Sequence, residues 1–259
     1  MERVNKYMML REQTVDCSQF ATLNKDLEEL TFHYCHIENL SAVTKMPLLR
    51  IIRFTSCTFG TGNLQALSGA PALARINVYD MCAEGLTELY GLKKLKRIAI
   101  RNVTGIELES LEEFINLYTL EIDNMGLHDG TFIGKLVNLR RLDLHKHVMD
   151  NLDFLEQLPS LYKFNLLNAA KNEEGLMAVA GLSNLKEFIY PVKDLSIYRN
   201  LPKLEAAGMA PDVHNGFEVF AGSKVCRFVV CGKSSHKNND RIAEQMKKYV
   251  RIYSYGSSS

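Results

Sequence analysis

Hydrophobic residues recur along this chain in short segments that share one pattern. In Leu27-Glu-Glu-Leu30-Thr-Phe32, apolar side chains occupy positions 1, 4 and 6, and the same positions are apolar in later segments. Because side chains two residues apart lie on the same face of an extended strand, positions 4 and 6 predict a short β-strand with one buried face. The segments, mostly 22 or 24 residues apart, begin at Leu27, Leu49, Leu73, Leu95, Leu117, Leu139, Leu161, Leu185, Leu204 and Val225.

A second pattern fills the residues between these predicted strands. Leu86, Leu89, Leu92 and Leu95 follow one another at intervals of three, and several other repeats show the same spacing. This interval predicts a tight helical turn, of 3₁₀ or α type, with a single apolar stripe. One strand and one turn cannot bury their apolar faces alone, so we expect the repeats to stack around a continuous core.

The combined pattern, LxxLxLxx followed by LxxLxxLxxL, resembles the leucine-rich repeat family in its short class of about 22 residues per repeat. Bacterial internalins and a protein-phosphatase regulatory subunit belong to this class. The resemblance implies an α/β solenoid with capped ends, a curved parallel sheet on the concave face and short helical or 3₁₀ turns on the convex face. Position 9 departs from the family, which usually has Asn there to bond the turn; this chain has residues such as Cys35, Cys57 and His147. We therefore expect other partners for the turn backbones and less regular repeats, especially after Lys193.

Both ends of such a stack need to be closed, because an open end exposes apolar core and strand edges. In the C-terminal cap, Asp240 is the predicted N-cap of a helix over residues 241–249. A last strand is expected within residues 251–255, followed by a disordered tail over residues 257–259. The predicted organisation is an N-terminal cap over residues 1–26, a repeat region over residues 27–232 and a C-terminal cap over residues 233–259.

Composition and charge narrow the range of partners. Hydrophobic residues make up 46% of the 259 positions, charged residues make up 24%, and the net charge is +1. A near-neutral chain argues against general nucleic-acid binding, which needs a basic excess. No segment reaches the roughly 18 apolar residues of a membrane span, and the apolar run at residues 7–10 is too short for a signal-peptide core. We expect a cytoplasmic monomer that binds neither nucleic acid nor membrane and keeps its six cysteines as free thiols.

Candidate binding residues follow from the strand pattern. If positions 4 and 6 point inward, positions 3, 5 and 7 point outward onto the concave sheet and are solvated. A predicted basic row consists of Arg75, Arg97, Arg141 and Lys163. A predicted acidic patch consists of Glu121, Asp123 and Asp143. The predicted protein-binding residues are Arg53, Arg75, Tyr79, Arg97, Arg101, Glu121, Asp123, Arg141, Asp143 and His145.

The alternative interpretation of these charges is that they only neutralise one another. Asp143 would then pair with Arg141 on its own strand, and Asp123 with Arg101 on the neighbouring strand. Surface pairs of this kind are worth about 0 to 1 kcal/mol. We favour the binding interpretation, because the family resemblance implies that this face carries the partner.

Cysteine and histidine residues give only weak signals of catalysis. Cys35 lies near His33, but Cys35 is expected to be buried while His33 points outward, so a structural thiol is favoured over a nucleophile. At the other end of the chain, the spatial arrangement of Cys226, Cys231 and His236 can distinguish an enzyme from a binding protein. Their convergence in a cleft would favour an enzyme, and their dispersion would favour a binding protein.

A metal site is not expected either, since Asp143 and His145 point outward whereas His147 points inward. No cofactor is implied. The favoured function is a non-enzymatic module that binds a folded protein partner through its concave face, as a regulatory subunit, an adaptor or a bacterial immunity protein. One alternative is an enzyme with a site at an irregular repeat or at the C-terminal cap, and another is a structural solenoid that associates with itself.

Overall fold

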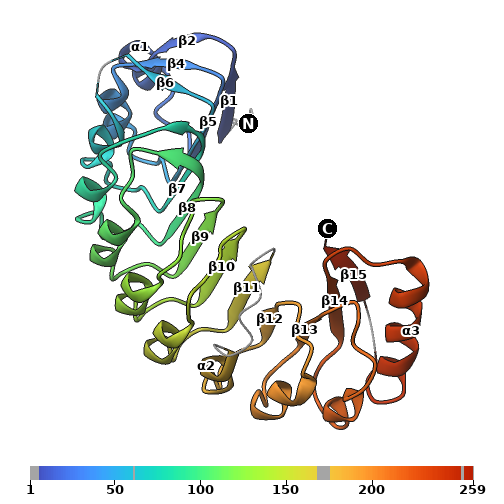
Figure 1. Ribbon diagram of the computed structural model, residues 1–259. Helices are drawn as coiled ribbons and strands as arrows, with labels where there is room; N and C mark the ends of the chain where they lie inside the picture. Colours follow the sequence, from blue (N-terminus) through green and yellow to red (C-terminus); the bar gives the residue numbers. More distant parts are fainter. Residues whose placement is uncertain (1–5, 61, 168–175, 252–253, 259) are drawn as a thin grey trace. The chain divides into compact units, whose positions relative to one another are not determined.

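The computed structural model describes residues 6–60, 62–167 and 176–251, together with the backbone of residues 254–258. The chain forms two compact units, Met1–Met125 and Gly126–Ser259. In each unit, parallel strands form one layer and the helical segments follow the strands on one side of that layer (Figure 1). The strand-and-turn repeat predicted from the sequence is therefore confirmed in both units.

In the first unit, the strands of the main sheet neighbour one another in chain order and pair in parallel. They are β1 (Tyr7–Arg11), β3 (Glu29–His33), β5 (Ile51–Thr55), β7 (Arg75–Cys82), β8 (Arg97–Thr104) and β9 (Thr119–Asp123). A small second sheet contains β2 (Thr14–Asp16), β4 (His36–Glu38) and β6 (Thr58–Phe59). The helical segments are α1 (Cys17–Leu23) and the 3₁₀ turns Leu40–Lys45, Leu64–Leu67, Thr87–Leu89 and Leu108–Glu113.

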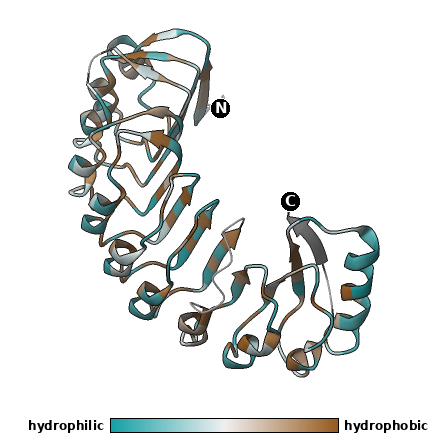
Figure 2. Cartoon of the chain, in the orientation of Figure 1, coloured by the Kyte–Doolittle hydropathy of each residue, from teal (hydrophilic) through white to brown (hydrophobic). Residues whose placement is uncertain are grey.

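The register of these strands puts equivalent positions of successive repeats side by side. Ile52 lies opposite Leu30 on one neighbouring strand and opposite Ile76 on the other. From β3 to β9, the residues at positions 4 and 6 are all 0% exposed, so they form the continuous core that the apolar pattern predicts. Phe32 and Phe54 stack within this core, with ring centroids 5.5 Å apart. Figure 2 shows the corresponding alternation of hydrophobic and hydrophilic residues along the strands.

The N-terminal segment contributes a strand to the main sheet as well as a helix. β1 pairs with β3 in the same register that joins the later repeats, with Tyr7 opposite Glu29. After β2, α1 begins where Asp16 accepts hydrogen bonds from the backbone N–H and the hydroxyl of Ser18, at 2.8 and 2.7 Å. The predicted 1–26 cap region thus contains the strand and the helical half of an additional repeat.

One backbone conformation recurs at position 8, which directly follows most of the strands and lies within the longer β7 and β8. Position 8 of successive repeats is left-handed, with φ between 49° and 58°, a conformation that Asn and Asp adopt more readily than most residues. Asp80, Asn102 and Asn124 use it to form a chain of side-chain hydrogen bonds, from Asn124 to Asn102 and from Asn102 to Asp80. The left-handed residues are Glu12, Tyr34, Ser56, Asp80, Asn102, Asn124 and Lys146. A polar ladder is therefore present, one position earlier than in the family pattern.

Position 9 satisfies turn backbone groups with sulfur and imidazole atoms. The Cys35 thiol donates to the carbonyl oxygens of Leu10 and His33, at 3.5 and 3.3 Å. Cys57 makes the equivalent contacts one repeat later. In the second unit, the buried His147 accepts a hydrogen bond from the Leu127 N–H at 3.2 Å. The expectation that the turns find partners other than Asn is confirmed at these residues.

The second unit continues the same alternation, with parallel strands in chain order. The strands are β10 (Arg141–His145), β11 (Lys163–Leu167), β12 (Glu187–Ile189), β13 (Ala206–Met209), β14 (Arg227–Cys231) and β15 (Ser254–Ser258). The helical segments are α2 (Met177–Ala180), α3 (His236–Lys247) and the 3₁₀ turns Thr131–Lys135, Asp153–Gln157, Leu195–Asn200 and Phe217–Phe220.

The expected loss of regularity is visible at β12 and β13. β12 has three residues, and only Glu187 and Phe188 pair with β13. At Gly208 the backbone comes so close to Tyr190 that an added Cβ would lie 2.4 Å from its amide nitrogen. The buried Tyr198 hydroxyl donates to the Gly208 carbonyl. A glycine and a buried tyrosine thus accommodate the shortened repeat.

Two predictions for the C-terminal cap need correction. The helix is present as α3, but it begins at His236, because the Ser235 hydroxyl caps it by accepting from the Asn238 N–H at 3.3 Å; Asp240 lies inside it. Its apolar face is buried, with Ile242 and Met246 both 0% exposed, and its outer surface is hydrophilic (Figure 2). The predicted last strand is β15, which pairs with β14 and includes residues 257 and 258, so these two are not in a disordered tail. Residue 259 lies outside the described residues.

Candidate functional site

The candidate site is the sheet face that carries positions 3, 5 and 7 of the strands, here called the open face. In both units, most residues at positions 3 and 7 are half-buried. Several residues at position 5 lie deeper, with Asn77 and Asp143 each 2% exposed and Ala99 0% exposed, whereas Arg53 and Glu121 are half-buried. The alternation of strand residues gives the correct side of the sheet, but it does not predict this difference in depth.

In the first unit, two arginines of the open face pair with glutamates on a neighbouring strand. Arg53 contacts Glu29 at 3.0 Å, and Arg97 contacts Glu121 at 3.1 Å. All four side chains are between about one quarter and two fifths exposed, so each pair lies at the edge of solvent. Pairs in this environment stabilise by about 0 to 1 kcal/mol, and their main consequence is to fix the direction of each charge.

Arg75 has a different environment from these two arginines. Its Nε donates to Oδ1 of Asn77 at 2.9 Å, and Nδ2 of Asn77 donates to the Tyr79 hydroxyl at 2.7 Å. Burial lowers the pKa of Arg75, and the positive charges of Arg97 and Arg53 lower it further. Burial also raises the pKa of Tyr79, so its phenol stays protonated. Arg75 is thus held in place by neutral groups and lies near the like charges of Arg97 and Arg53, while Glu121 acts on it as a weaker opposite charge.

In the same unit, Arg101 lies at position 7, further along the strand direction than Arg75 at position 3. Its guanidinium contacts Asp80 at 2.7 Å and lies over the Tyr79 ring, 4.7 Å from the centroid. The hydrogen bond to Asp80 raises the pKa of Arg101, and Asp123 contributes to the same effect through its charge. Asp80 was not among the predicted binding residues, although an acidic residue at position 8 beside an arginine at position 7 of the next repeat is visible in the sequence.

In the second unit, the structure corrects the expectation that Asp143 is solvated. Arg141 donates from Nε and Asn165 donates from Nδ2 to the Asp143 carboxylate, and these two side chains help to enclose it. Asp143 is 2% exposed, whereas Arg141 is 33% exposed. The predicted pairing of Asp143 with Arg141 on its own strand is therefore confirmed, but as a contact to a buried carboxylate.

The members of the predicted acidic patch belong to different units. Glu121 and Asp123 lie in the first unit, and Asp143 lies in the second. Glu121 is neutralised by Arg97 and Asp143 by Arg141, each within its own unit. The patch as one binding cluster therefore stays a prediction, and the structure describes these carboxylates as parts of separate ion pairs.

A second charged cluster of this unit was not among the predicted binding residues. Glu187 contacts Lys163 at 2.5 Å and Arg227 at 2.7 Å. Burial by itself raises the pKa of Glu187, but hydrogen bonds and charges from Lys163 and Arg227 outweigh burial and leave the pKa below its ordinary value. All three residues occupy position 3 of their repeats, so the strand pattern could have identified them together.

The described hydrogen bonds of the candidate catalytic thiols go to backbone carbonyl groups. Cys35 is buried and bonds backbone carbonyls, as expected of a structural thiol. Cys226 and Cys231 donate to separate backbone carbonyls, those of Glu205 and Val229, while His236 is exposed at the start of α3. Across the described residues, no group of three or more His, Cys, Asp or Glu side chains is arranged to hold a metal ion.

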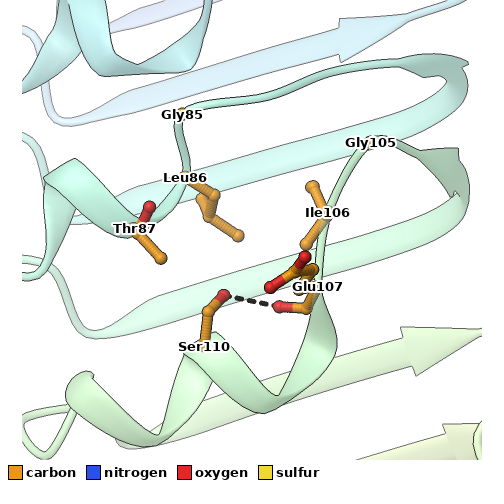
Figure 3. Close-up of a pocket in the computed structure, with 7 residues that line it drawn as sticks. All are labelled: Gly85, Leu86, Thr87, Gly105, Ile106, Glu107 and Ser110. Atoms are coloured by element: carbon orange, nitrogen blue, oxygen red, sulfur yellow. Dashed lines mark hydrogen bonds between the residues drawn. The ribbon is translucent and has the colours of Figure 1, made fainter.

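A small pocket lies away from the open face in the first unit (Figure 3). It has a volume of about 160 Å³ and lies between two successive turns that contain Gly85 and Gly105, with φ of 74° and 84°. Leu86, Thr87, Ile106, Glu107 and Ser110 complete its lining. The Ser110 hydroxyl donates to the Glu107 carbonyl oxygen, so the serine is used within its own turn. The pocket is small, and Glu107 is its single charged lining residue.

Comparisons with models of known protein families and with curated proteins found no match. Similarity appears in comparisons of structure. An internalin, inlF from Listeria monocytogenes, is 13% identical with a TM-score of 0.56, and the alignment covers 98% of this chain and 86% of that one. The internalin inlC2 from the same species is 18% identical with a TM-score of 0.54, covering 71% of this chain and 79% of that one.

A plant receptor has a similar fold. The LRR ectodomain of the membrane receptor kinase GASSHO1/SCHENGEN3 from Arabidopsis thaliana is 12% identical with a TM-score of 0.54. The alignment covers 98% of this chain and 36% of the ectodomain chain. None of the described helices is long and apolar enough to cross a membrane. Identities this low establish architecture alone, and together with the in-register parallel strands they show that this chain has the leucine-rich-repeat fold.

Proposed function

We propose that this chain is a non-enzymatic module that binds a folded protein partner on its open face. The observation that carries the proposal is the order of the charged side chains there. Arg53, Arg97 and Arg101 are each held by a carboxylate, and Arg75 is held by Asn77. Because these side chains are already fixed, a partner would lose little conformational entropy in ordering them. Their pattern of charge would favour complementary surfaces and accelerate encounter.

The structural neighbours support a role in binding. The GASSHO1/SCHENGEN3 ectodomain was solved in complex with CASPARIAN STRIP INTEGRITY FACTOR 2. We extend only the general property, recognition of another macromolecule, to this chain. A regulatory subunit, an adaptor and a bacterial immunity protein are the specific roles that we propose for such a module. Nothing in the geometry of the described residues favours the enzyme or the self-associating solenoid over these roles.

Photo-crosslinking in cell extracts tests whether the open face is the binding surface. The amino acid p-benzoylphenylalanine replaces His33, which is half-buried at position 7 of β3, or Tyr90, which is 59% exposed in a turn outside the open face. Both sites lie in the first unit, His33 on the open face and Tyr90 outside it, with Tyr90 the more exposed of the two. We expect a discrete protein adduct from the His33 variant and none from the Tyr90 variant. Adducts from the Tyr90 variant alone would show that the partner binds elsewhere.

A further inference from the structure

Arg75 differs from most arginines of the open face in having no carboxylate in contact with it. The exposed Arg11 on β1, whose Nε bonds the Met9 sulfur, shares this property. Arg53, Arg97, Arg101, Arg141 and Arg227 each contact a carboxylate within 4 Å. In the part of the chain that the structure describes, Arg75 contacts none, and its one side-chain hydrogen bond goes from Nε to the neutral Asn77. Its terminal nitrogens, Nη1 and Nη2, therefore retain their donors. A guanidinium is always charged near neutral pH, so this half-buried charge has no carboxylate in contact with it among the described residues, and Glu121 acts on it only from a distance.

The strand register places further positive charge beside Arg75. Arg75 on β7 lies directly opposite Arg97 on β8, and neighbouring strands are about 4.8 Å apart. Arg53 on β5 is diagonal to it, since Arg53 pairs with Asn77 two residues further along β7. Like charges at adjacent positions of a sheet repel, and both neighbours disfavour the charged form of Arg75. A negative group bound here would relieve that repulsion.

The neighbouring Arg75 and Arg97 also have more hydrogen-bond donors than they have acceptors around them. Arg97 gives its Nη2 to Glu121, while its Nε is buried and has no hydrogen-bond partner in the structure. An unsatisfied buried donor costs free energy that a new acceptor nearby can recover. The buried Asn77, which is 2% exposed, accepts the hydrogen bond from Arg75 Nε and so holds the Arg75 side chain in place. The Arg75 guanidinium is therefore held in one orientation, and its Nη1 and Nη2 have no acceptor among the described residues.

We propose that Arg75, supported by Asn77 and flanked by Arg53 and Arg97, binds the carboxylate of an Asp or Glu side chain of the protein partner. This inference rests on the proposed function, because it names the group that the partner brings to the open face. A carboxylate has two oxygens in one plane and accepts two parallel hydrogen bonds from a guanidinium. Glu29 and Glu121 neutralise the arginines on either side, so the site offers one net positive charge and fits one carboxylate. A nucleic-acid strand carries a continuous row of phosphates, which these flanking carboxylates would repel.

The test uses the full chain and a fluorescent hexa-aspartate peptide as the probe, with binding measured by fluorescence anisotropy at low and at physiological salt. Arg75→Gln should weaken binding by about tenfold or more, since it removes a charged hydrogen-bond donor. The control Arg50→Gln changes the net charge equally at an exposed residue outside the open face, and should change affinity less than about twofold. Arg75→Lys keeps the charge without the two-pronged geometry and should give an intermediate affinity. Circular dichroism verifies that each variant is folded.

Several results would overturn the inference. These are no binding of the peptide by the wild-type chain, equal weakening by Arg75→Gln and Arg50→Gln, or tighter binding of a hexa-uridylate RNA than of the peptide. The crosslinking experiment separates this inference from the proposed function. If the adduct at His33 forms equally well in an Arg75→Gln background, the open face binds the partner but Arg75 does not hold its carboxylate. If no adduct forms at His33, the proposed function itself fails.

Discussion

Removing the Asp143 carboxylate tests how the open face of the second unit is stabilised. The Asp143→Ala change leaves Nδ2 of Asn165, a residue 8% exposed, without the carboxylate that it bonds. It also leaves Nε of Arg141 without its partner, although that side chain is 33% exposed and water can solvate it. An unsatisfied buried donor costs about 1 to 3 kcal/mol, and a partly exposed ion pair adds about 0 to 1 kcal/mol. We therefore expect a loss of about 1 to 4 kcal/mol in the free energy of unfolding.

Glu121→Ala is the matched control for this prediction. Glu121 also pairs with an arginine of the open face, but it is 29% exposed, so its removal should cost about 0 to 1 kcal/mol. The chain has no tryptophan, and urea unfolding is therefore followed by circular dichroism. Because repeat units can unfold separately, hydrogen exchange at the Leu144 and Leu166 amides reports the local effect. If both variants lose less than about 0.5 kcal/mol, burial of Asp143 does not determine its contribution.

Three further predictions address the core, the thiols and the response to acid. Leu120 and Leu142 each occupy position 4 and are 0% exposed, so replacing either with Ala should lower the free energy of unfolding in urea by about 2 to 5 kcal/mol. Losses below about 1 kcal/mol for both variants would show that the assigned register is wrong. In the folded protein, the exposed Cys82 should react fastest with iodoacetamide and Cys17 slowest, since burial raises the pKa of the Cys17 thiol to about 12. A quantitative disulfide in protein whose thiols were trapped at lysis would contradict the expected cytoplasmic location. The pKa of Glu187 is lowered in the folded state, so its stabilising effect should be present above the unfolded-state pKa and lost as pH falls through the folded-state pKa. The free energies of unfolding of wild type and Glu187→Gln should therefore differ at neutral pH and converge in acid.

The strand register was predictable because burial repeats with the period of the strand. Leu120 and Ile122 are both 0% exposed, as their positions 4 and 6 predict, and the same holds for Leu142 and Leu144. The three-residue spacing likewise predicted the turns on the other side. These features depend on the number of residues per repeat, which a sequence contains directly.

The features that the sequence did not predict depend on neighbours in space. Asp143 is outward by its position but buried, because its depth is set by Arg141 and Asn165 lying over it. α3 begins at His236 rather than Arg241, since both Ser235 and Asp240 are good N-cap residues and local sequence does not choose between them. Whether an arginine of the open face contacts a carboxylate also depends on side-chain packing across strands, so Arg75 could be placed on the face but not distinguished from Arg97.

Depth on the open face also decides which acidic residue can report on binding. Reversing Glu121 and Asp143 together would mix two effects, because Asp143→Lys puts a cation against Arg141 at a buried site and destabilises the second unit. Glu121 lies at the edge of solvent, so Glu121→Lys alone should keep the fold. This change removes the carboxylate that pairs with Arg97, which lies beside Arg75, and makes this part of the open face more positive. If Arg75 binds a carboxylate, Glu121→Lys should therefore strengthen binding of the hexa-aspartate peptide, with the larger effect at low salt. A partner that brings a cation to Glu121 would instead lose affinity for the same variant, so this one change separates the two charge arrangements on the first unit.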